Sequence, residues 1–394
     1  MPSTYRVETF PAATPAASSV FTTVLSQGPL TRVELARRTG LSSAAVTKAV
    51  RPLMEAGYVV EAADAADDGA RPALGRPANP VRVDGGRALF LGVKVTADEV
   101  IAVLTDLCCR IRVARHAPLT RSEPAAVLDL IASLTEELLT EAEGYGVQVQ
   151  GLGIAVSGDV DRAAGVVRYS PFLGWHDIAL ADVAMEATGL PVTVDNDVRA
   201  LTIAEQWFGG GVGCANFALV TVGAGIGCGL VVNGRVVSGS HGVAGEIGHL
   251  SIDPQGPLCH CGNTGCVEAI ASDSAIVRRI RADTGRDVAD SAQGLELAHG
   301  GNPVARAAYA RAGEAIGRAI GAVVNLLGPE RVIISGEGLA AYDLFAEQIR
   351  EAFSSAAFGT AAQCEVTTRP LPFDEWARGA AAAAIQTFIG SEPC

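Results

Sequence analysis

From Leu89 onward, short apolar segments typical of buried strands alternate with longer helical patterns. One series contains the strand-like segments 89–93, 100–104, 152–156 and 192–194, and a second contains 217–222, 230–232 and 332–334. Strands that alternate with helices along the chain are typical of α/β proteins. Two such series predict two α/β lobes with a cleft between them.

The composition excludes several other classes of protein. A chain of 394 residues with 49% hydrophobic residues is neither a disordered tail nor a small disulfide-stapled scaffold. Its 45 glycines have no three-residue period, which excludes collagen. There is no run of about 18 uncharged apolar residues, and the N-terminus lacks the pattern of a signal peptide. We therefore expect a soluble, cytoplasmic protein.

The residues before this region have a helical pattern with short interruptions. Thr31 and Glu34 have the spacing of a capping box, which would begin a second helix, and Gly40 is placed to end it. A third helix is expected from about Ser42, with Val46 facing inward. A glycine turn between two short helices, followed by such an apolar anchor, predicts a helix-turn-helix.

The other face of this third helix is expected to contact DNA, because small polar residues followed by cations suit the major groove and its phosphates. Two strands around a Gly/Arg/Pro tip would form a wing, whose arginines could reach phosphate or the minor groove. The alternative is a three-helix oligomerisation module with an arginine-bearing linker. The predicted DNA contacts are Ser42, Ser43, Ala44, Thr47, Lys48, Arg51, Arg71 and Arg76.

The charge distribution favours DNA binding by the N-terminal part alone. Residues 1–87 carry ten basic and eight acidic side chains, whereas the remaining chain carries 20 basic and 35 acidic ones. A slightly basic segment on an acidic body implies that only this segment approaches a polyanion.

Three cysteines and one histidine have the spacing of a metal site. His249, Cys259, Cys261 and Cys266 form the pattern H-x9-C-x-C-x4-C. Three thiolates and one imidazole complete a closed tetrahedral Zn²⁺ site, which would be structural because it leaves no position for a catalytic water. The alternative is three reduced cysteines beside an unrelated histidine. The other six cysteines are interpreted as small apolar residues.

Several polar groups lie where a small molecule could bind. Asn196 and Asp197 follow a predicted strand, and Glu246 and Glu268 flank the cysteine cluster. Carboxylates and an amide suit sugar hydroxyls, although each acid alone could equally be a helix cap or a surface group. The glycine-rich segment 223–229 would either let backbone amides approach an anion or form a plain hairpin turn.

These motifs together resemble the ROK (repressor, open reading frame, kinase) family, and in particular its winged-helix repressor branch, which includes xylose and N-acetylglucosamine repressors. The resemblance covers nearly the whole chain. It rests on the segments Gly245–His249 (GEIGH), Cys259–Glu268 (CHCGNTGCVE) and Ser170–Trp175 (SPFLGW), and the glycine-rich turn also fits.

The resemblance implies a fold and a set of ligands. The fold would be a two-lobed actin-like ATPase (ribonuclease H-like) α/β body behind a winged helix-turn-helix. The domains would be 1–87, 88–205 and 206–394, with zinc in the second lobe and the C-terminal helix returning to the first. The histidine would serve both metal and sugar. The residues that match the family's sugar ligands are Asn196, Asp197, Glu246, His249 and Glu268.

The sequence departs from the family's kinases at the ATP site. In kinase members, the acid that matches Asp197 is the general base, and an Asp-x-Gly-x-Thr loop holds phosphate and magnesium. Here Lys94 replaces the acid of that loop and Thr96 replaces its glycine. A lysine repels the metal, and a β-branched residue blocks close backbone approach. We therefore expect no catalytic residue and no enzyme activity.

The resulting hypothesis is a sugar-responsive transcriptional regulator of carbohydrate metabolism, with repression as the expected sign. Its partners would be operator DNA, a monosaccharide or sugar-phosphate effector and further copies of the chain, as a homodimer or tetramer. Its location would be the bacterial cytoplasm, at the nucleoid when bound to DNA. Two alternatives stay open: an ATP-dependent sugar kinase with a DNA-binding head, and a regulator controlled by a protein partner.

Overall fold

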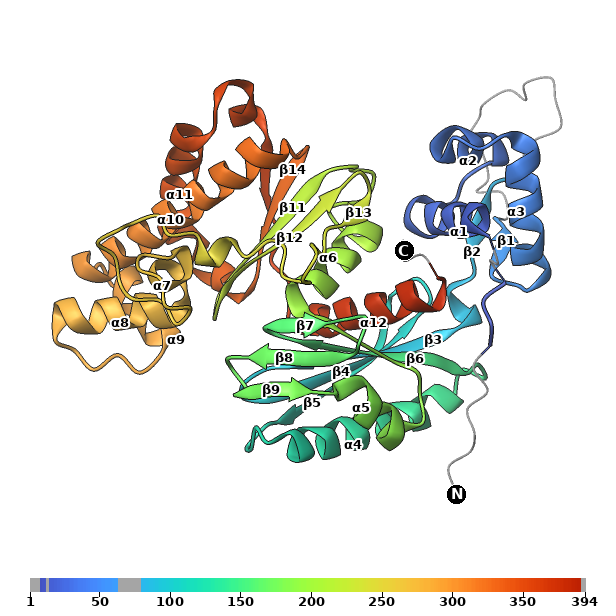
Figure 1. Cartoon of the computed structure of the whole chain (residues 1–394), viewed down its shortest axis with the longest axis horizontal. Coiled ribbons are helices and arrows are strands. Elements are labelled where there is room, and N and C mark those ends of the chain that lie inside the picture. The colour runs from blue at the N-terminus through green and yellow to red at the C-terminus, as the bar shows by residue number, and fades with distance from the viewer. Residues whose placement is uncertain (1–7, 12–13, 63–78, 391–394) are drawn as a thin grey trace. The chain divides into compact units, whose positions relative to one another are not determined.

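The computed structural model describes residues 8–11, 14–62 and 79–390 (Figure 1). The chain divides into two compact units. The first unit comprises residues 1–213 together with 374–394, and the second comprises residues 214–373. Within the described part of the chain, no helix is both long and apolar enough to cross a membrane.

The N-terminal head, residues 1–87, contains the predicted helix-turn-helix. Thr31 caps the second helix, and the reciprocal hydrogen bonds with Glu34 confirm the capping box. Gly40 ends that helix in the left-handed conformation, with φ of 70°. Val46 is buried under the third helix, as predicted. The helices are α1 (Pro15–Gln27), α2 (Arg32–Thr39) and α3 (Ser43–Glu55), and the antiparallel wing strands are β1 (Val59–Glu61) and β2 (Val81–Val83).

The rest of the first unit is a five-stranded sheet with helices on both faces. Its order is β10-β6-β3-β4-β5, in which β3, β4 and β5 form an antiparallel meander while β6 and β10 are parallel to β3. Helices α4 and α5 cover one face and α12 covers the other (Figure 1). These strands are β3 (Leu89–Val95), β4 (Glu99–Asp106), β5 (Ile111–Pro118), β6 (Val149–Val156) and β10 (Val192–Asn196). The helices are α4 (Pro124–Glu143), α5 (Leu180–Thr188), α6 (Asp197–Phe208) and α12 (Asp374–Phe388). A small antiparallel sheet adds β7 (Asp159–Asp161), β8 (Val166–Ser170) and β9 (Trp175–Ile178).

The alanine-rich helix α12 approaches the sheet closely because glycines lie beneath it. A Cβ at Gly92 on β3 would lie 2.0 Å from the carbonyl oxygen of Ala377, and one at Gly153 on β6 would lie 1.8 Å from that of Ala380. Neither position can hold a side chain unless α12 moves. The helix is therefore seated directly over the two central parallel strands.

The second unit repeats the topology of the first. Its order is β13-β12-β11-β14-β15, again an antiparallel meander of three strands followed by two strands parallel to the first. This duplication confirms the two predicted strand–helix series. The strands are β11 (Phe217–Val222), β12 (Ile226–Val232), β13 (Arg235–Val236), β14 (Arg331–Ser335) and β15 (Glu365–Thr368). The helices are α7 (Val267–Ala271), α8 (Asp273–Thr284), α9 (Ser291–His299), α10 (Pro303–Leu327) and α11 (Tyr342–Ala356).

The sequence did not reveal β15. We took the segment around Val332 as the last clear parallel strand, but β15 pairs parallel to β14 beyond it. Its sequence, Glu-Val-Thr-Thr, has a single aliphatic residue, and all four positions are exposed or half-buried because the strand lies at the sheet edge. An edge strand of this composition lacks the apolar run that marks a buried one.

Candidate functional site

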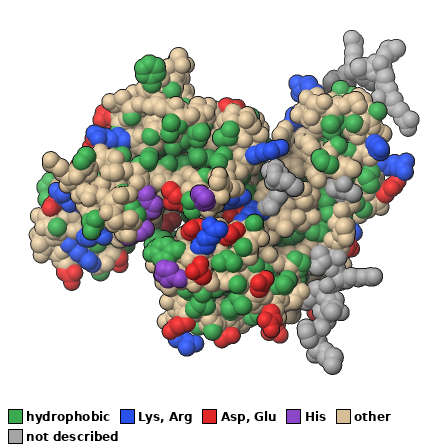
Figure 2. Space-filling model, in the orientation of Figure 1, with side chains coloured by type: hydrophobic (Ala, Val, Ile, Leu, Met, Phe, Trp, Pro, Cys, Tyr) green, Lys and Arg blue, Asp and Glu red, His purple; other side chains and the backbone are tan. Residues whose placement is uncertain are grey.

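The outer face of α3 carries the six predicted helix contacts to DNA, and all six are exposed. This face borders an open groove of about 750 Å³, lined by Ser43, Ala44, Thr47, Lys48, Arg51, Pro52 and Glu55. Several Lys or Arg side chains reach the outer surface of the head (Figure 2). The two predicted wing contacts, Arg71 and Arg76, lie outside the described residues.

Local hydrogen bonds fix the polar side chains of α3. The Ser42 hydroxyl caps the helix by accepting from the Ala45 N–H at 3.2 Å, so its own proton remains available for donation. The Thr47 hydroxyl donates to the Ser43 carbonyl at 2.9 Å, and the residue remains exposed. Arg51 forms an exposed ion pair with Glu55 at 3.0 Å, a contact that a DNA phosphate would replace.

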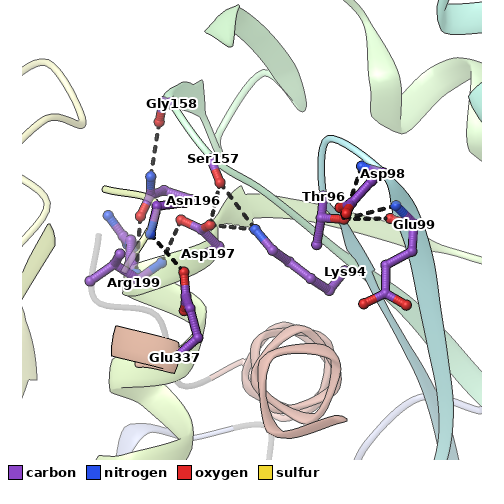
Figure 3. A network of polar contacts seen from close by, with 12 residues as sticks. Lys94, Thr96, Asp98, Glu99, Ser157, Gly158, Asn196, Asp197, Arg199 and Glu337 are labelled. Carbon is purple, nitrogen blue, oxygen red and sulfur yellow. Dashed lines mark hydrogen bonds and ion pairs between the residues drawn. The ribbon is translucent and has the colours of Figure 1, made fainter. Parts of the chain in front are cut away.

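A buried polar cluster lies at the carboxyl ends of three strands in the first unit (Figure 3). Lys94 comes from β3, Ser157 follows β6, and Asp197 begins α6 directly after β10. The Lys94 ammonium forms an ion pair with the Asp197 carboxylate and donates to the Ser157 hydroxyl at 3.1 Å. Ser157 in turn donates to the same carboxylate oxygen at 2.5 Å.

The Asp197 carboxylate is ionised and fully engaged. Burial by itself would raise its pKa, but the Lys94 charge and hydrogen bonds from Lys94, Ser157 and the Val198 N–H hold the pKa below its usual value. The residue is 7% exposed and Lys94 is 5% exposed. A carboxylate stabilised in this way is a weak base, because taking up a proton would leave the buried lysine charge unpaired.

Asn196, the other predicted sugar ligand of this unit, caps α6. Its side-chain oxygen accepts from the Arg199 N–H at 3.1 Å, and its amide donates to the Gly158 carbonyl at 2.9 Å. The side chains of Asn196 and Asp197 are therefore both fixed by hydrogen bonds or ion pairs within the first unit.

The turn after β3 is closed by Thr96. Its hydroxyl accepts from the N–H groups of Asp98 and Glu99, at 3.3 and 2.9 Å, and contacts the Asp98 carboxylate at 3.0 Å. These backbone donors serve the turn itself (Figure 3).

The four predicted zinc ligands of the second unit converge. The ligand atoms of His249, Cys259, Cys261 and Cys266 lie within 4.8 Å of one another. Cys259 Sγ is 3.6 Å from His249 Nδ1, and Cys261 Sγ is 3.7 Å from Cys266 Sγ. A tetrahedral zinc with bonds of about 2.3 Å has edges of about 3.8 Å. The donor set and these separations fit zinc.

The surrounding groups are also consistent with a metal. A backbone hydrogen bond from Asn263 is the main cause that lowers the pKa of the Cys261 thiol, whereas burial raises the pKa of the Cys259 and Cys266 thiols. His260 and Glu268 form a second group with His249 and Cys259, within the same 4.8 Å. This second group has only one cysteine. The group of His249 with Cys259, Cys261 and Cys266 has three, which is the ligand set typical of structural zinc.

The two predicted sugar-binding carboxylates of the second unit differ in exposure and in hydrogen bonding. Glu246 is about half exposed, and its carboxylate lies 4.0 Å from His249 Nε2, the ring nitrogen that does not face Cys259. Glu268 is mostly buried: it pairs with His260 at 2.7 Å and accepts from the Ile226 N–H at 3.1 Å. His249 thus has Nδ1 toward Cys259 and Nε2 toward Glu246.

Sequence reasoning missed the ion pair between Lys94 and Asp197. We interpreted Lys94 as a loss from a phosphate loop, with a cation that still binds phosphate as the alternative. A signal was present, because a lysine within the apolar strand LFLGVKV must find a charged partner when that strand is buried.

Two family models match this chain. A winged helix-turn-helix DNA-binding model matches residues 23–60, and the ROK family model matches residues 90–387, well over half of the chain. The molecule is a winged helix-turn-helix protein with an α/β body of the actin-like ATPase fold. The chain belongs to the ROK family, as predicted.

Individual relatives agree with this assignment. A putative xylose repressor from Caldicellulosiruptor sp. (strain Rt8B.4) is 29% identical over 356 residues, which cover 86% of this chain and 88% of the relative. The solved structure of a ROK family transcriptional regulator, a homologue of the E. coli MLC protein, matches 95% of this chain and 96% of its own, with a TM-score of 0.78 and 27% identity. A ROK glucokinase from Streptomyces griseus, solved with glucose and AMPPNP, matches 76% of this chain and 99% of its own, with a TM-score of 0.65 and 27% identity.

Proposed function

We propose that this protein is a sugar-responsive, DNA-binding transcriptional repressor that has no kinase activity. One observation carries the proposal: the same chain joins an exposed helix-turn-helix face to a ROK body whose Asp197 carboxylate is bound by Lys94. Similarity to a xylose repressor and to a ROK transcriptional regulator over nearly the whole chain supports it.

The absence of kinase activity follows from charge and geometry. A general base must accept a proton from the attacking sugar hydroxyl. Asp197 is a poor acceptor, because Lys94 and Ser157 already stabilise its ionised form. The Lys94 ammonium also opposes binding of a magnesium ion near Asp197, and Thr96 closes the adjacent turn. These features support a degenerate phosphate site.

For the effector we propose a monosaccharide or sugar phosphate. The candidate ligands remain the predicted ones: Asn196 and Asp197 in the first unit, and Glu246, His249 and Glu268 in the second. Their acceptor oxygens and ring nitrogen suit hydroxyl groups. A sugar hydroxyl that donates to Asp197 would share the carboxylate with Lys94, whose ammonium can donate to a sugar oxygen in return.

The remaining parts follow from the same proposal. The head, residues 1–87, would bind operator DNA, and residues 88–205 and 206–394 would be the two lobes, with α12 returning to the first. His249, Cys259, Cys261 and Cys266 would hold a structural zinc that stabilises the loop carrying Glu246 and Glu268. A homodimer or tetramer would present two heads to a two-fold operator.

The test begins with the DNA site. Operator sequences are selected from a random duplex pool with the full-length protein, and the best duplex is titrated with and without a panel of monosaccharides and sugar phosphates. We expect specific binding that one sugar weakens, and no ATP turnover with any sugar in a coupled assay. Sugar phosphate formation that disappears in Asp197→Ala would establish the kinase alternative instead. Specific DNA binding that no sugar changes would favour control by a protein partner.

A further inference from the structure

The glycine-rich turn between β11 and β12 holds a carboxylate that belongs to the chain itself. The turn, residues 223–225, joins the two strands as a hairpin, so the hairpin alternative of the sequence is realised. The Ala224 N–H donates to Glu337 Oε1 at 2.8 Å. Glu337 follows β14, which is parallel to β11 and adjacent to it. The carboxyl ends of neighbouring parallel strands therefore bring the carboxylate and the turn together.

The fit between the turn and this side chain depends on Gly223. A Cβ at Gly223 would lie 2.1 Å from Glu337 Oε1, so a side chain at this position would displace the carboxylate from the turn. The Gly223 N–H is used within the turn, where it donates to the Gly225 carbonyl at 3.1 Å, and the Gly223 carbonyl accepts from the Asp273 N–H at 2.9 Å. The turn is thus built around the Glu337 carboxylate.

This location matters because of what such turns bind in other proteins. Glycine-rich turns at the carboxyl ends of parallel strands offer backbone N–H groups to phosphate oxygens. A carboxylate and a phosphate compete for the same donor, and they repel each other.

A second carboxyl group strengthens the local negative charge. Asp273 begins α8 beside Gly223. Burial, and then the Glu337 charge, raise the pKa of Asp273 to about 6. An anion entering the turn would therefore meet the Asp273 carboxyl group as well as the Glu337 side chain.

We propose that Glu337 is a specificity-determining residue, which excludes the phosphate chain of nucleotides from the second unit by filling the oxyanion position of the 223–225 turn. The inference deepens the proposed non-kinase function and rests on it. Lys94 and Thr96 disable phosphate chemistry in the first unit, whereas Glu337 closes the second unit independently of them.

Nucleotide binding by the full-length protein tests this proposal. Calorimetric titration with AMPPNP and magnesium at pH 7.5 should show no saturation in the unmodified protein at millimolar ligand. Glu337→Ala should bind AMPPNP at least about tenfold more tightly, because it removes both the bulk and the charge. Glu337→Gln keeps the bulk and removes the charge, so it should show a smaller gain. Inorganic triphosphate should show the same order of affinities.

Glu330→Ala is the matched control. The Glu330 carboxylate also accepts from backbone N–H groups, those of Ala215 and Asn216 at 2.8 and 3.0 Å, but at the amino ends of β11 and β14. This variant should gain no affinity for either ligand. Thermal unfolding checks that each variant is folded.

Two outcomes would overturn the inference. A folded Glu337→Ala could bind AMPPNP no more tightly than the unmodified protein does. A gain for AMPPNP without a gain for triphosphate would place the block at the base instead of the phosphates. Failure of the proposed function has a different signature, namely sugar phosphorylation by the unmodified chain.

Discussion

At the scale of single residues, the most consequential feature of the first unit is a buried ion pair. Lys94 and Asp197 are both almost completely buried, and each is the other's charged partner. Removing both charges together costs little when the space is filled, but removing one of them leaves an uncompensated charge in the interior. The pair therefore contributes to the stability of the first unit, and under the proposed function it is also what makes Asp197 a poor base.

Lys94→Met should destabilise the protein by about 3 kcal/mol, because Asp197 would remain buried without its partner. Adding Asp197→Asn should recover part of this loss, since the double variant buries no charge at this point. The free energy of unfolding, measured in urea for the two single variants and the double variant, gives the coupling. Additive effects would show that the two side chains do not interact.

Asp273 should make stability depend on pH. The pKa of this group is about 6 in the folded protein, above its ordinary value of 3.8, so the folded protein binds the proton more tightly than the unfolded chain does. Its contribution to stability is full below about pH 4 and is lost as the pH rises through about 6. Asp273→Asn should remove a dependence on the order of 1–2 kcal/mol. Urea unfolding at pH 5 and 7.5 measures this, and equal pH dependence in both proteins would contradict it.

At the scale of elements, short irregular segments carry the specific chemistry and regular elements position them. The loop that carries Cys259, Cys261 and Cys266 is shaped by isolated bridges between Ser251 and Cys266 and between Leu258 and Thr264. Such a loop has little apolar packing of its own, so a metal would supply much of its stability. The recognition helix α3, by contrast, is anchored by buried Val46, Val50 and Leu53.

We expect one zinc per chain and its loss in Cys261→Ser, with a lower thermal midpoint and weaker sugar binding. Cys214→Ser is the control, because Cys214 lies outside the cluster and its change should leave the metal content unaltered. Elemental analysis of protein purified without chelator measures the content. Zinc-free unmodified protein would refute the assignment.

Lys48→Ala and Arg51→Ala should each weaken operator binding and lower the salt slope of log K by about one unit, as expected for lost phosphate contacts. Arg318→Ala is the matched control, because Arg318 forms an exposed i,i+4 ion pair on α10 like that of Arg51. Fluorescence anisotropy over a range of salt concentrations gives the slopes. An unchanged slope in the double variant would remove α3 from the interface.

At the scale of the whole molecule, the head is joined to the first lobe by an aromatic cluster at the end of α12. Phe388 lies with its ring centroid 5.5 Å from Phe10, 6.2 Å from Tyr58 and 5.3 Å from Phe90 of β3. At the other end of α12, Trp376 contacts the Lys94 ammonium, 5.6 Å from the ring centroid. The helix thus links the Asp197 cluster to the head.

Phe388→Ala should therefore uncouple sugar binding from DNA binding. It removes apolar contacts between head and lobe, at a cost of about 2–4 kcal/mol for a half-buried ring, and leaves the Asp197 cluster and α3 in place. Operator titrations with and without the effector sugar should show normal DNA affinity but a smaller sugar effect. Phe358→Ala, an exposed phenylalanine of the second unit, is the control and should respond normally.

Local patterns in the sequence determined a large part of this protein. The capping box at Thr31, the turn at Gly40, the strand–helix alternation and the spacing of His249 with the three cysteines all depend on neighbouring residues, so they could be read without a structure. The sugar ligands and the DNA contacts stay predictions, although the residues proposed for α3 are exposed as expected.

Contacts between distant segments were decided by the tertiary structure alone. Lys94 meets Asp197 across 103 residues, and Glu337 meets the turn at Gly223 across more than a hundred. Neighbouring parallel strands have their carboxyl ends side by side, whatever their separation in sequence. The hydrophobic periodicity of the sequence does not show which strands become neighbours. The sequence therefore identified the polar and charged residues, and the order of the strands decided which of them come into contact.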